Sequence, residues 1–309
     1  MDNCYGKDEG DGLDFYNNKD NLILFIRGTR MSKLKKALQK AKESRDLEGQ
    51  HLYKENGKTK LSGYAKVTKD IECRSELDIR YSETKIKKID DSVLKEGKVI
   101  SLFHEIEKID QIKSLRTQIL NHLNEVGGNS ILVTSANPCE GKTFTSINLG
   151  VSIAQELDRT VLIVDADLRK HIKNHKDFAS DFFGTAMTEG LSNYLLGQAE
   201  IPELLLNPGI ERLVLLPAGR PLPNSAELLG SPRMVMLVND IKSRYSDDRI
   251  IIFDSSSILS SADPLVLTRY VDGVLLIVEE EKTTADDLKK TMELLKDKRV
   301  LGTVLNKSK

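Results

Sequence analysis

Short apolar runs alternate with longer amphipathic stretches from about Ser130 onward. The runs are continuous and rich in Ile, Val and Leu, which is typical of strands covered on both faces of a sheet. We predict strands at 131–133, 161–164, 213–216, 250–253, 274–278 and 300–305. The stretches between them predict helices at 143–157, 232–245 and 285–295. This alternation predicts an α/β fold with a doubly wound, mostly parallel sheet.

The first third of the chain has a different character. Residues 1–98 are polar and only weakly periodic, so we expect them to be partly disordered, with residues 99–309 forming the folded domain. Within the polar part, residues 31–44 combine a narrow apolar stripe at helical spacing with many lysines. This segment is either a solvated helix or a basic amphipathic helix that meets a partner or an anionic membrane surface.

Charge and cysteine content limit the possible settings. The formal net charge of -1 gives no reason to expect a nucleic-acid partner. Cys4, Cys73 and Cys139 are too few and too far apart for a disulfide framework, which favours a reducing compartment. The chain begins without a signal-peptide pattern, and its apolar runs, such as 22–26, are far shorter than the ~20 residues of a membrane helix. We therefore expect a cytoplasmic protein.

A phosphate-binding loop is predicted between the strand at 131–133 and the following helix. The segment 135–143 reads Ser-Ala-Asn-Pro-Cys-Glu-Gly-Lys-Thr, with Ala136 where the strict P-loop pattern has Gly. Backbone amides and the positive helix end would hold the phosphates of ATP, and Lys142 would reach the β- and γ-phosphates. We expect the nucleotide to contact Asn137, Pro138, Cys139, Glu140, Gly141, Lys142, Thr143 and Phe144.

Acidic residues end two of the predicted strands. Asp165 and Asp167 follow the run 161–164, and Asp254 follows the run 250–253. Carboxyl ends of parallel strands meet at the edge where open α/β sheets bind ligands. A Thr hydroxyl and carboxylates suit Mg²⁺ bound to a polyphosphate. The sequence therefore predicts a magnesium site made of Thr143, Asp167 and Asp254.

Several stretches resemble the bacterial tyrosine kinases, P-loop enzymes of polysaccharide export. Residues 165–169, Asp-Ala-Asp-Leu-Arg, resemble the family's Walker A′ motif. Residues 138–143 are similar to Pro-Gly-Glu-Gly-Lys-Ser/Thr, with Cys139 in place of Gly, and 216–229 also look like the family. Residues 110–116 resemble the Glu-x-x-Arg-x-x-Arg helix that packs one subunit against the next nucleotide site.

The resemblance implies an Mg·ATP-dependent protein-tyrosine kinase that acts in exopolysaccharide biosynthesis or export. Lys142 would stabilise the γ-phosphoryl group and Asp165 would take the proton of the incoming hydroxyl. Asp167 would act on Mg²⁺, and Arg169 would orient the acidic strand end. Asn306 is similar to an adenine-contacting Asn. The resemblance also implies a homo-oligomer and a membrane chain-length-determinant or co-polymerase partner, which would recruit the protein to the inner face of the membrane.

Two departures keep other interpretations open. The family continues its Walker B strand with Asp-x-Pro-Pro, whereas Asp254 is followed by three serines, and the last tyrosine of this chain is Tyr270 rather than part of a C-terminal cluster. One alternative is an ATP-controlled switch protein that regulates a membrane chain-length partner and phosphorylates nothing. Another is a partitioning-type ATPase, although that group carries a lysine where this chain has Asn137.

The likeness begins at Met31. Residues 31–38 look like the start of short, soluble members linked to exosortase-type exopolysaccharide systems. We therefore expect translation to start at Met31, which would make residues 1–30 an upstream artefact or a dispensable extension. The alternative is a genuine disordered N-terminal extension.

Overall fold

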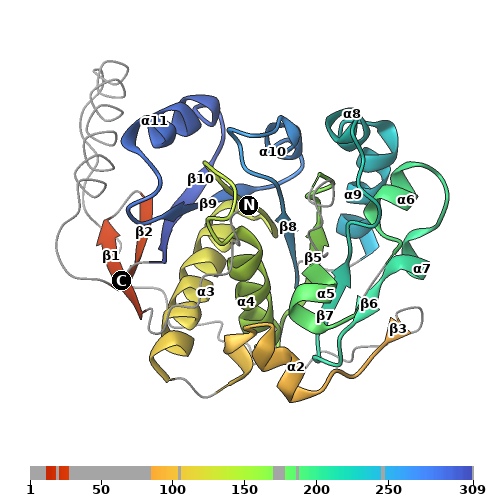
Figure 1. Ribbon diagram of the computed structural model, residues 1–309, viewed down its shortest axis with the longest axis horizontal. Coiled ribbons are helices and arrows are strands. Elements are labelled where there is room, and N and C mark those ends of the chain that lie inside the picture. Colours follow the sequence, from red (N-terminus) through yellow and green to blue (C-terminus); the bar gives the residue numbers. More distant parts are fainter. Residues whose placement is uncertain are drawn as a thin grey trace, which may run out of the picture.

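The computed structural model describes residues 12–18, 21–27, 85–103, 106–169, 178–185, 188–244 and 248–307. The basic helix expected at 31–44 lies outside these ranges. Figure 1 shows a central sheet with helices on both faces, which confirms the predicted α/β fold. Within the described part of the chain, no helix is long and apolar enough to span a membrane.

The sheet has ten strands. In spatial order they are β1 (Gly12–Asn18), β2 (Asn21–Arg27), β10 (Val300–Asn306), β9 (Gly273–Glu279), β4 (Ser130–Ser135), β8 (Arg249–Asp254), β5 (Thr160–Asp165), β7 (Leu213–Leu216), β6 (Leu206–Asn207) and β3 (Lys85–Ile86). From β10 to β7 every neighbouring pair is parallel. All the strands predicted from the apolar runs are confirmed. After β4 the chain forms β5, β7 and β8 on one side of β4, and then forms β9 on its other side.

The helices surround this sheet. They are α2 (Asp91–Glu96), the 3₁₀ helix η1 (Ile100–Leu102), α3 (Ile106–Val126), α4 (Lys142–Ala154), α5 (Phe178–Phe183), α6 (Leu191–Leu195), α7 (Ile201–Leu204), α8 (Ser225–Leu229), α9 (Pro232–Arg244), α10 (Asp263–Leu267) and α11 (Ala285–Leu294). The helices predicted at 143–157, 232–245 and 285–295 correspond to α4, α9 and α11.

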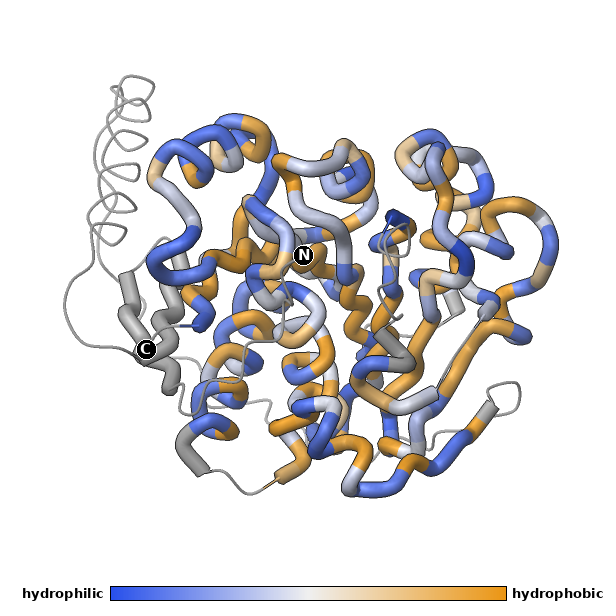
Figure 2. The backbone as a smooth tube through the Cα atoms, in the orientation of Figure 1, coloured by the Kyte–Doolittle hydropathy of each residue, from blue (hydrophilic) through white to orange (hydrophobic). Residues whose placement is uncertain are grey.

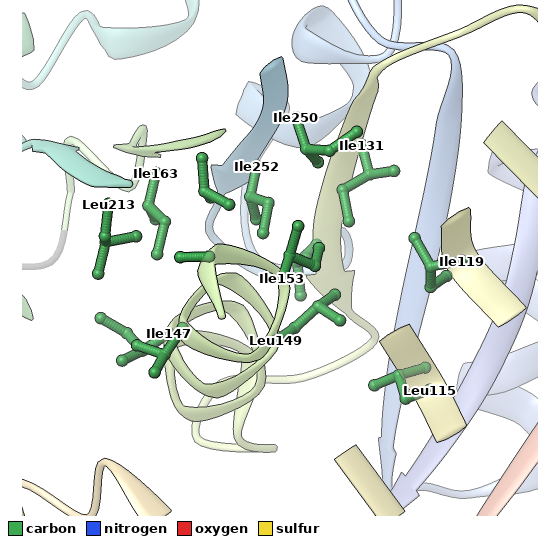
Figure 3. Close-up of a cluster of buried hydrophobic side chains, with 14 of the residues drawn as sticks. Leu115, Ile119, Ile131, Ile147, Leu149, Ile153, Ile163, Leu213, Ile250 and Ile252 are labelled. Carbon is green, nitrogen blue, oxygen red and sulfur yellow. The ribbon is translucent and has the colours of Figure 1, made fainter. Parts of the chain in front are cut away.

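Residues that alternate along the strands enter two different cores. On β4, Ile131 and Val133 pack with α3 and α4, whereas Leu132 packs with α6, α9 and α10 on the other face. Figure 3 shows the first of these clusters, where Ile147 and Ile153 of α4 lie against the strands. Figure 2 shows the hydrophobic colour concentrated in the central strands, while the helices alternate between the two colours. Both faces of the strands are therefore buried, as the continuous apolar runs required.

One glycine brings α4 close to the sheet. A Cβ at Gly150 would lie 2.6 Å from Cδ1 of Ile163 on β5, a distance that real Cβ atoms do not reach. A side chain at position 150 would require the Ile163 side chain to move. The helix that begins at Lys142 is thus held tightly against β5 and β8, whose ends carry the acidic residues.

Three strands of the range 1–98 belong to the sheet. The strands β1 and β2 form an antiparallel pair, and β2 runs parallel to β10, with Leu22 to Phe25 in register with Gly302 to Leu305. At the opposite edge, β3 pairs with β6. Residues of the polar N-terminal range therefore extend both edges of the sheet, because unpaired edge strands can accept additional backbone partners.

Candidate nucleotide-binding site

The loop between β4 and α4 has the geometry expected of a phosphate-binding loop. The strand ends at Ser135 and the helix begins at Lys142, with Gly141 as its N-cap at a φ of 94°. A Cβ at Gly141 would lie 1.8 Å from Nδ2 of Asn306, so both the backbone angle and the space require glycine. The amide groups of the first turn of α4 therefore face the loop without a side chain in between.

The start of the loop is held by short-range hydrogen bonds. The hydroxyl of Ser135 donates to the carbonyl of Asn137 at 2.6 Å, and the amide N–H of Asn137 donates to Oε2 of Glu140 at 3.0 Å. The side-chain amide of Asn137 donates to Asp287 of α11 at 3.2 Å. Hydrogen bonds from Thr284 and Asn137 lower the pKa of Asp287, which keeps this carboxylate charged. Asn137 is thus bound through its backbone and its side chain.

Glu140 is completely buried inside the loop. Its Oε1 accepts a hydrogen bond from the hydroxyl of Thr283, in the connection between β9 and α11. Burial raises the pKa of Glu140, while Thr283, the Asn137 amide and the charge of Lys142 oppose that rise. A buried carboxyl group next to a predicted phosphate site is unusual, because it adds negative charge where anions are to bind.

The last strand closes the loop from another side. Nδ2 of Asn306 donates to the carbonyl of Glu140 at 2.9 Å, and Nζ of Lys307 donates to the carbonyl of Cys139 at 2.9 Å. Lys307 also pairs with Glu279 at 3.4 Å. The predicted adenine-contacting residue Asn306 therefore uses its amide N–H to hold the loop, and its base-binding role stays a proposal.

Thr143 and Asp254 meet at the edge of the sheet. The hydroxyl of Thr143 donates to Oδ2 of Asp254 at 2.7 Å, and the hydroxyl of Ser146 donates to Oδ1 at 3.1 Å. The P-loop helix and the Walker B strand are thus joined through one buried carboxylate. Among the residues that the structure describes, no three His, Cys, Asp or Glu side chains cluster as a metal cage. Magnesium needs few protein ligands when phosphates and water supply the others, so the Thr143 and Asp254 oxygens fit it.

The second acidic pair lies on the neighbouring strand. Asp165 and Asp254 are register partners on β5 and β8. Oδ1 of Asp165 accepts the amide N–H of Asp167 at 3.1 Å, and both aspartates are buried. This bond fixes the turn after β5 so that Asp167 follows directly beyond the strand end. The structure therefore brings Asp165 to the same sheet edge as Asp254.

Arg169 connects this turn to α8, which lies within the stretch 216–229 that resembles the family, and to α10. Its Nε donates to the hydroxyl of Ser225 in α8 at 2.9 Å and lies 3.6 Å from Oδ2 of Asp263 in α10. Asp263 is completely buried, so Arg169 compensates a charge that would otherwise be unfavourable there. Arg169 therefore joins the turn after β5 to α8 and α10, and its orienting role stays a prediction.

Three predicted contact residues differ in how the structure presents them. Pro138 is exposed, whereas the ring of Phe144 packs against the core beneath α4, so only its backbone is suited to meet a nucleotide. Cys139 has a φ of 65°, a conformation that favours glycine.

The helix with the resemblance to an intersubunit motif makes contacts within its own chain. The guanidinium of Arg116 on α3 lies 2.9 Å from Glu156 and donates to the carbonyl of Ser152 at 2.8 Å. Asp110 and Lys113 lie 3.9 Å apart on the exposed side of α3. Arg116 therefore joins α3 to the end of α4 in this structure, while Asp110 and Lys113 remain at the surface.

Known bacterial tyrosine-protein kinases are similar to this chain in sequence and in structure. No family model matches the chain. The tyrosine-protein kinase YwqD of Bacillus subtilis (strain 168) is 32% identical over 202 residues, which cover 65% of this chain and 81% of YwqD. CapB of Staphylococcus aureus is 30% identical over 202 residues, covering 64% of this chain and 83% of CapB. The solved kinase domain of the Escherichia coli tyrosine kinase ETK superposes with a TM-score of 0.62 at 27% identity, covering 75% of this chain and 85% of that domain. Other curated relatives are longer, and the chain spans about a quarter of their length.

Proposed function

The chain belongs to the family of bacterial tyrosine-protein kinases, and on this premise we propose that it binds ATP with magnesium and transfers the γ-phosphoryl group to a tyrosine hydroxyl of a protein. The observation that carries the proposal is the 2.7 Å hydrogen bond between Thr143 and Asp254, beside the loop that opens α4. This bond joins a phosphate-binding element to an acidic strand end, and phosphoryl transfer needs both together.

The loop between β4 and α4 and its Lys142 would bind the phosphates. The amide groups at the start of α4 and the positive end of this helix are donors for phosphate oxygens. Lys142 is buried at the same helix end and would stabilise the charge that spreads over the γ-phosphoryl oxygens during transfer. Asn306 closes the far side of the loop and would meet the base.

Magnesium would be held by Thr143 and Asp254, with Asp167 acting directly or through water. Bound there with the nucleotide, the ion neutralises phosphate charge during transfer. The chain itself prepares this position, because Ser146 and Thr143 both orient the Asp254 carboxylate. All of these donors are oxygen atoms, which is the ligand type that Mg²⁺ prefers.

Asp165 would act as the base for the incoming tyrosine. The phenolic proton moves to the Asp165 carboxylate as the tyrosine oxygen bonds to the γ-phosphorus, and the bond to the bridging oxygen breaks, leaving ADP. The hydrogen bond from the Asp167 amide holds the carboxylate of Asp165 in a fixed orientation. Arg169 is a positioning residue that keeps the turn in place through Ser225 and Asp263.

The physiological setting follows from the family resemblance. We place the chain in exopolysaccharide biosynthesis or export, in the cytoplasm, with a membrane chain-length-determinant or co-polymerase protein as its partner. That partner would recruit the chain to the inner face of the membrane. A homo-oligomer would let one copy present a tyrosine to the site of the next.

A second candidate function is favoured by the positions of two tyrosines. Tyr194 and Tyr270 are the tyrosines whose side chains the structure describes. Both are buried, and the Tyr270 hydroxyl donates to the carbonyl of Leu229 at 3.0 Å. Burial raises the pKa of Tyr194, so its hydroxyl is a poor nucleophile as well as an inaccessible one. Neither side chain can reach another subunit's site without local unfolding. An ATP-controlled interaction protein, which changes its partner contacts with the bound nucleotide and phosphorylates nothing, would need no accessible tyrosine.

Incubation with γ-labelled ATP and magnesium separates the two functions. The full chain is mixed with a poly-Glu-Tyr acceptor, and label in tyrosine is measured after acid hydrolysis. The kinase predicts phosphotyrosine that is absent when Asp165 is replaced by Asn. Binding of ATP with no label in any acceptor would favour the switch protein, and absence of ATP binding would exclude both.

A further inference from the structure

Glu140 has no part in the chemistry described above, yet it is among the most buried charged residues of the site. The Thr283 hydroxyl accepts the amide N–H of Glu279 at 3.0 Å and also contacts Oε1 of Glu140. A hydroxyl group has one proton and two lone pairs, and one lone pair of Thr283 accepts from Glu279. The Thr283 hydroxyl donates its proton to Oε1 of Glu140.

The other oxygen of Glu140 is also an acceptor, because the amide N–H of Asn137 points at Oε2. The two donors therefore lie on two different oxygens of the Glu140 carboxyl group. Such charge-assisted bonds are stronger than neutral ones and are more sensitive to geometry. Glu140 thus links the start of the loop, through Asn137, to the β9–α11 connection, through Thr283.

Further contacts run in parallel with this link. The side chain of Asn137 reaches Asp287 in the first turn of α11, and Thr284 caps the same helix by accepting the Asp287 amide. Lys307 joins the Cys139 carbonyl to Glu279, at the end of β9. The residues 279–287 therefore surround the loop with hydrogen-bond partners, and Figure 1 shows α11 directly beside the ends of β9 and β10.

We propose that Glu140 is a positioning residue, whose hydrogen bond with Thr283 holds the phosphate-binding loop in its nucleotide-binding shape and makes ATP affinity depend on the β9–α11 connection. The inference rests on the proposed binding of ATP. Glu140 accepts the Asn137 amide N–H, while the amides at the start of α4 are the donors proposed for phosphate. Loss of the link leaves the loop free to change its curvature, which weakens phosphate binding before it affects the chemical step.

Four variants of the full chain test this role. Glu140→Ala removes both contacts of Glu140. Thr283→Val removes one of them, together with the acceptor of the Glu279 amide, and changes the volume little. Glu140→Gln removes the charge, but its amide oxygen can still accept from Asn137 and its NH₂ group can donate to Thr283. Thr283→Ser restores the hydroxyl. Thr291→Val is the matched control, because Thr291 is equally buried in α11 and its hydroxyl lacks a hydrogen-bond partner among the described residues.

The dissociation constant of a fluorescent ATP analogue with Mg²⁺ is measured for each variant, together with kcat, KM and the unfolding temperature. We expect an increase in Kd and KM of about tenfold for Glu140→Ala and about fivefold for Thr283→Val, with kcat within about twofold of the wild type. Thr283→Ser, Glu140→Gln and Thr291→Val should stay within about threefold. A purely structural residue would lower the unfolding temperature without this separation of KM from kcat.

The outcomes distinguish the inference from the proposed function. Wild-type Kd in both Glu140→Ala and Thr283→Val would overturn the inference while leaving ATP binding intact. Failure of the wild-type chain to bind the analogue would instead overturn the proposed function and the inference with it. If Glu140→Ala does not fold, the comparison of Thr283→Val with Thr283→Ser and Thr291→Val still decides, because equal affinities of the three would contradict the proposal.

Discussion

Asp254 accepts at its backbone carbonyl the amide N–H of Ala166, at 2.8 Å, so the turn after Asp165 starts from the backbone of the neighbouring acidic strand. Asp165 and Asp254 are both buried there. Two buried carboxylates at one point of a sheet edge are unfavourable unless cations lie close to them. This arrangement therefore suits a site that binds a metal ion with its nucleotide.

Replacement of either carboxylate by an amide should affect turnover far more than binding. For Asp254→Asn and for Asp165→Asn we expect kcat to fall by about 100-fold or more, because charge is lost where magnesium and the nucleophile act. The affinity for an ATP analogue without metal should change by less than about fivefold. Asp286→Asn, at an exposed position of α11, is the control. Wild-type turnover of both variants would show that the two carboxylates are only structural.

Lys142→Met should abolish ATP-dependent activity while the protein remains folded. The methionine side chain keeps most of the length and apolar contact of the lysine but leaves the phosphate charge uncompensated in a confined site. We expect ATP affinity to fall at least about tenfold, measured by calorimetry, with an unchanged far-ultraviolet circular dichroism spectrum. Unaltered affinity and turnover would refute the assignment of this loop.

Gly141→Ala tests the closeness of the last strand to the loop. The added Cβ would collide with Asn306, and the φ of 94° is unfavourable for any residue with a side chain. We expect nucleotide binding to be lost. Gly127→Ala is the matched control, since Gly127 also has a positive φ of 61° but nothing lies within 4 Å of the added atom. That variant should lose only about 1 kcal/mol of stability and bind nucleotide normally, and equal binding by both variants would contradict the steric argument.

Asp272 gives a prediction about acid stability. Burial alone would raise its pKa, but hydrogen bonds from the Ser130 hydroxyl and the Asn129 and Ser130 amides lower it overall. A lowered pKa in the folded state stabilises the fold above the unfolded value of about 3.9, and this stability is lost as the pH falls below that value toward the folded pKa.

Asp272→Asn should therefore reduce the free energy of unfolding at pH 7 by roughly 2 kcal/mol. The difference between variant and wild type should shrink as the pH falls below about 4. Urea denaturation at pH 7, 5, 4 and 3 measures both quantities. A difference that stays constant over this range would mean that the ionised form of Asp272 does not support the start of β4.

Much of the fold could be predicted because the central strands are covered on both faces. The run Ile250–Phe253 had to be apolar on every residue for that reason, and it became β8. The run at 22–26 has the same character, yet its place in the sheet could not be predicted, since β2 pairs with β10 at the other end of the chain. Short helices such as α6 and α10 lack enough turns to show a period.

The candidate site could be predicted where its residues are adjacent in the sequence and form a recognisable motif. The motif around Lys142 and the aspartates that end two strands fall into this class. Thr283 and Ser146 do not, because a single hydroxyl residue is common and their partners are 143 and 108 positions away. The sequence did indicate that Glu140 needs a partner, because a buried carboxylate in a phosphate-binding loop requires a hydrogen-bond donor. It could not show that Thr283 is this donor.

The contacts of Asn306 and Lys307 with the loop also set an order of events during protein synthesis. Their partners, Glu140 and Cys139, precede them by 166 and 168 residues. A growing chain is released from its N-terminal side and acquires structure in that direction, so the ribosome has already made the phosphate-binding loop long before β10 emerges. Until that strand reaches β9, the loop lacks the two donors that close it, and a nascent chain interrupted before β10 would hold a loop of the right sequence in an unfinished shape. We therefore expect nucleotide affinity to appear only after β10 has been synthesised and has paired with β9.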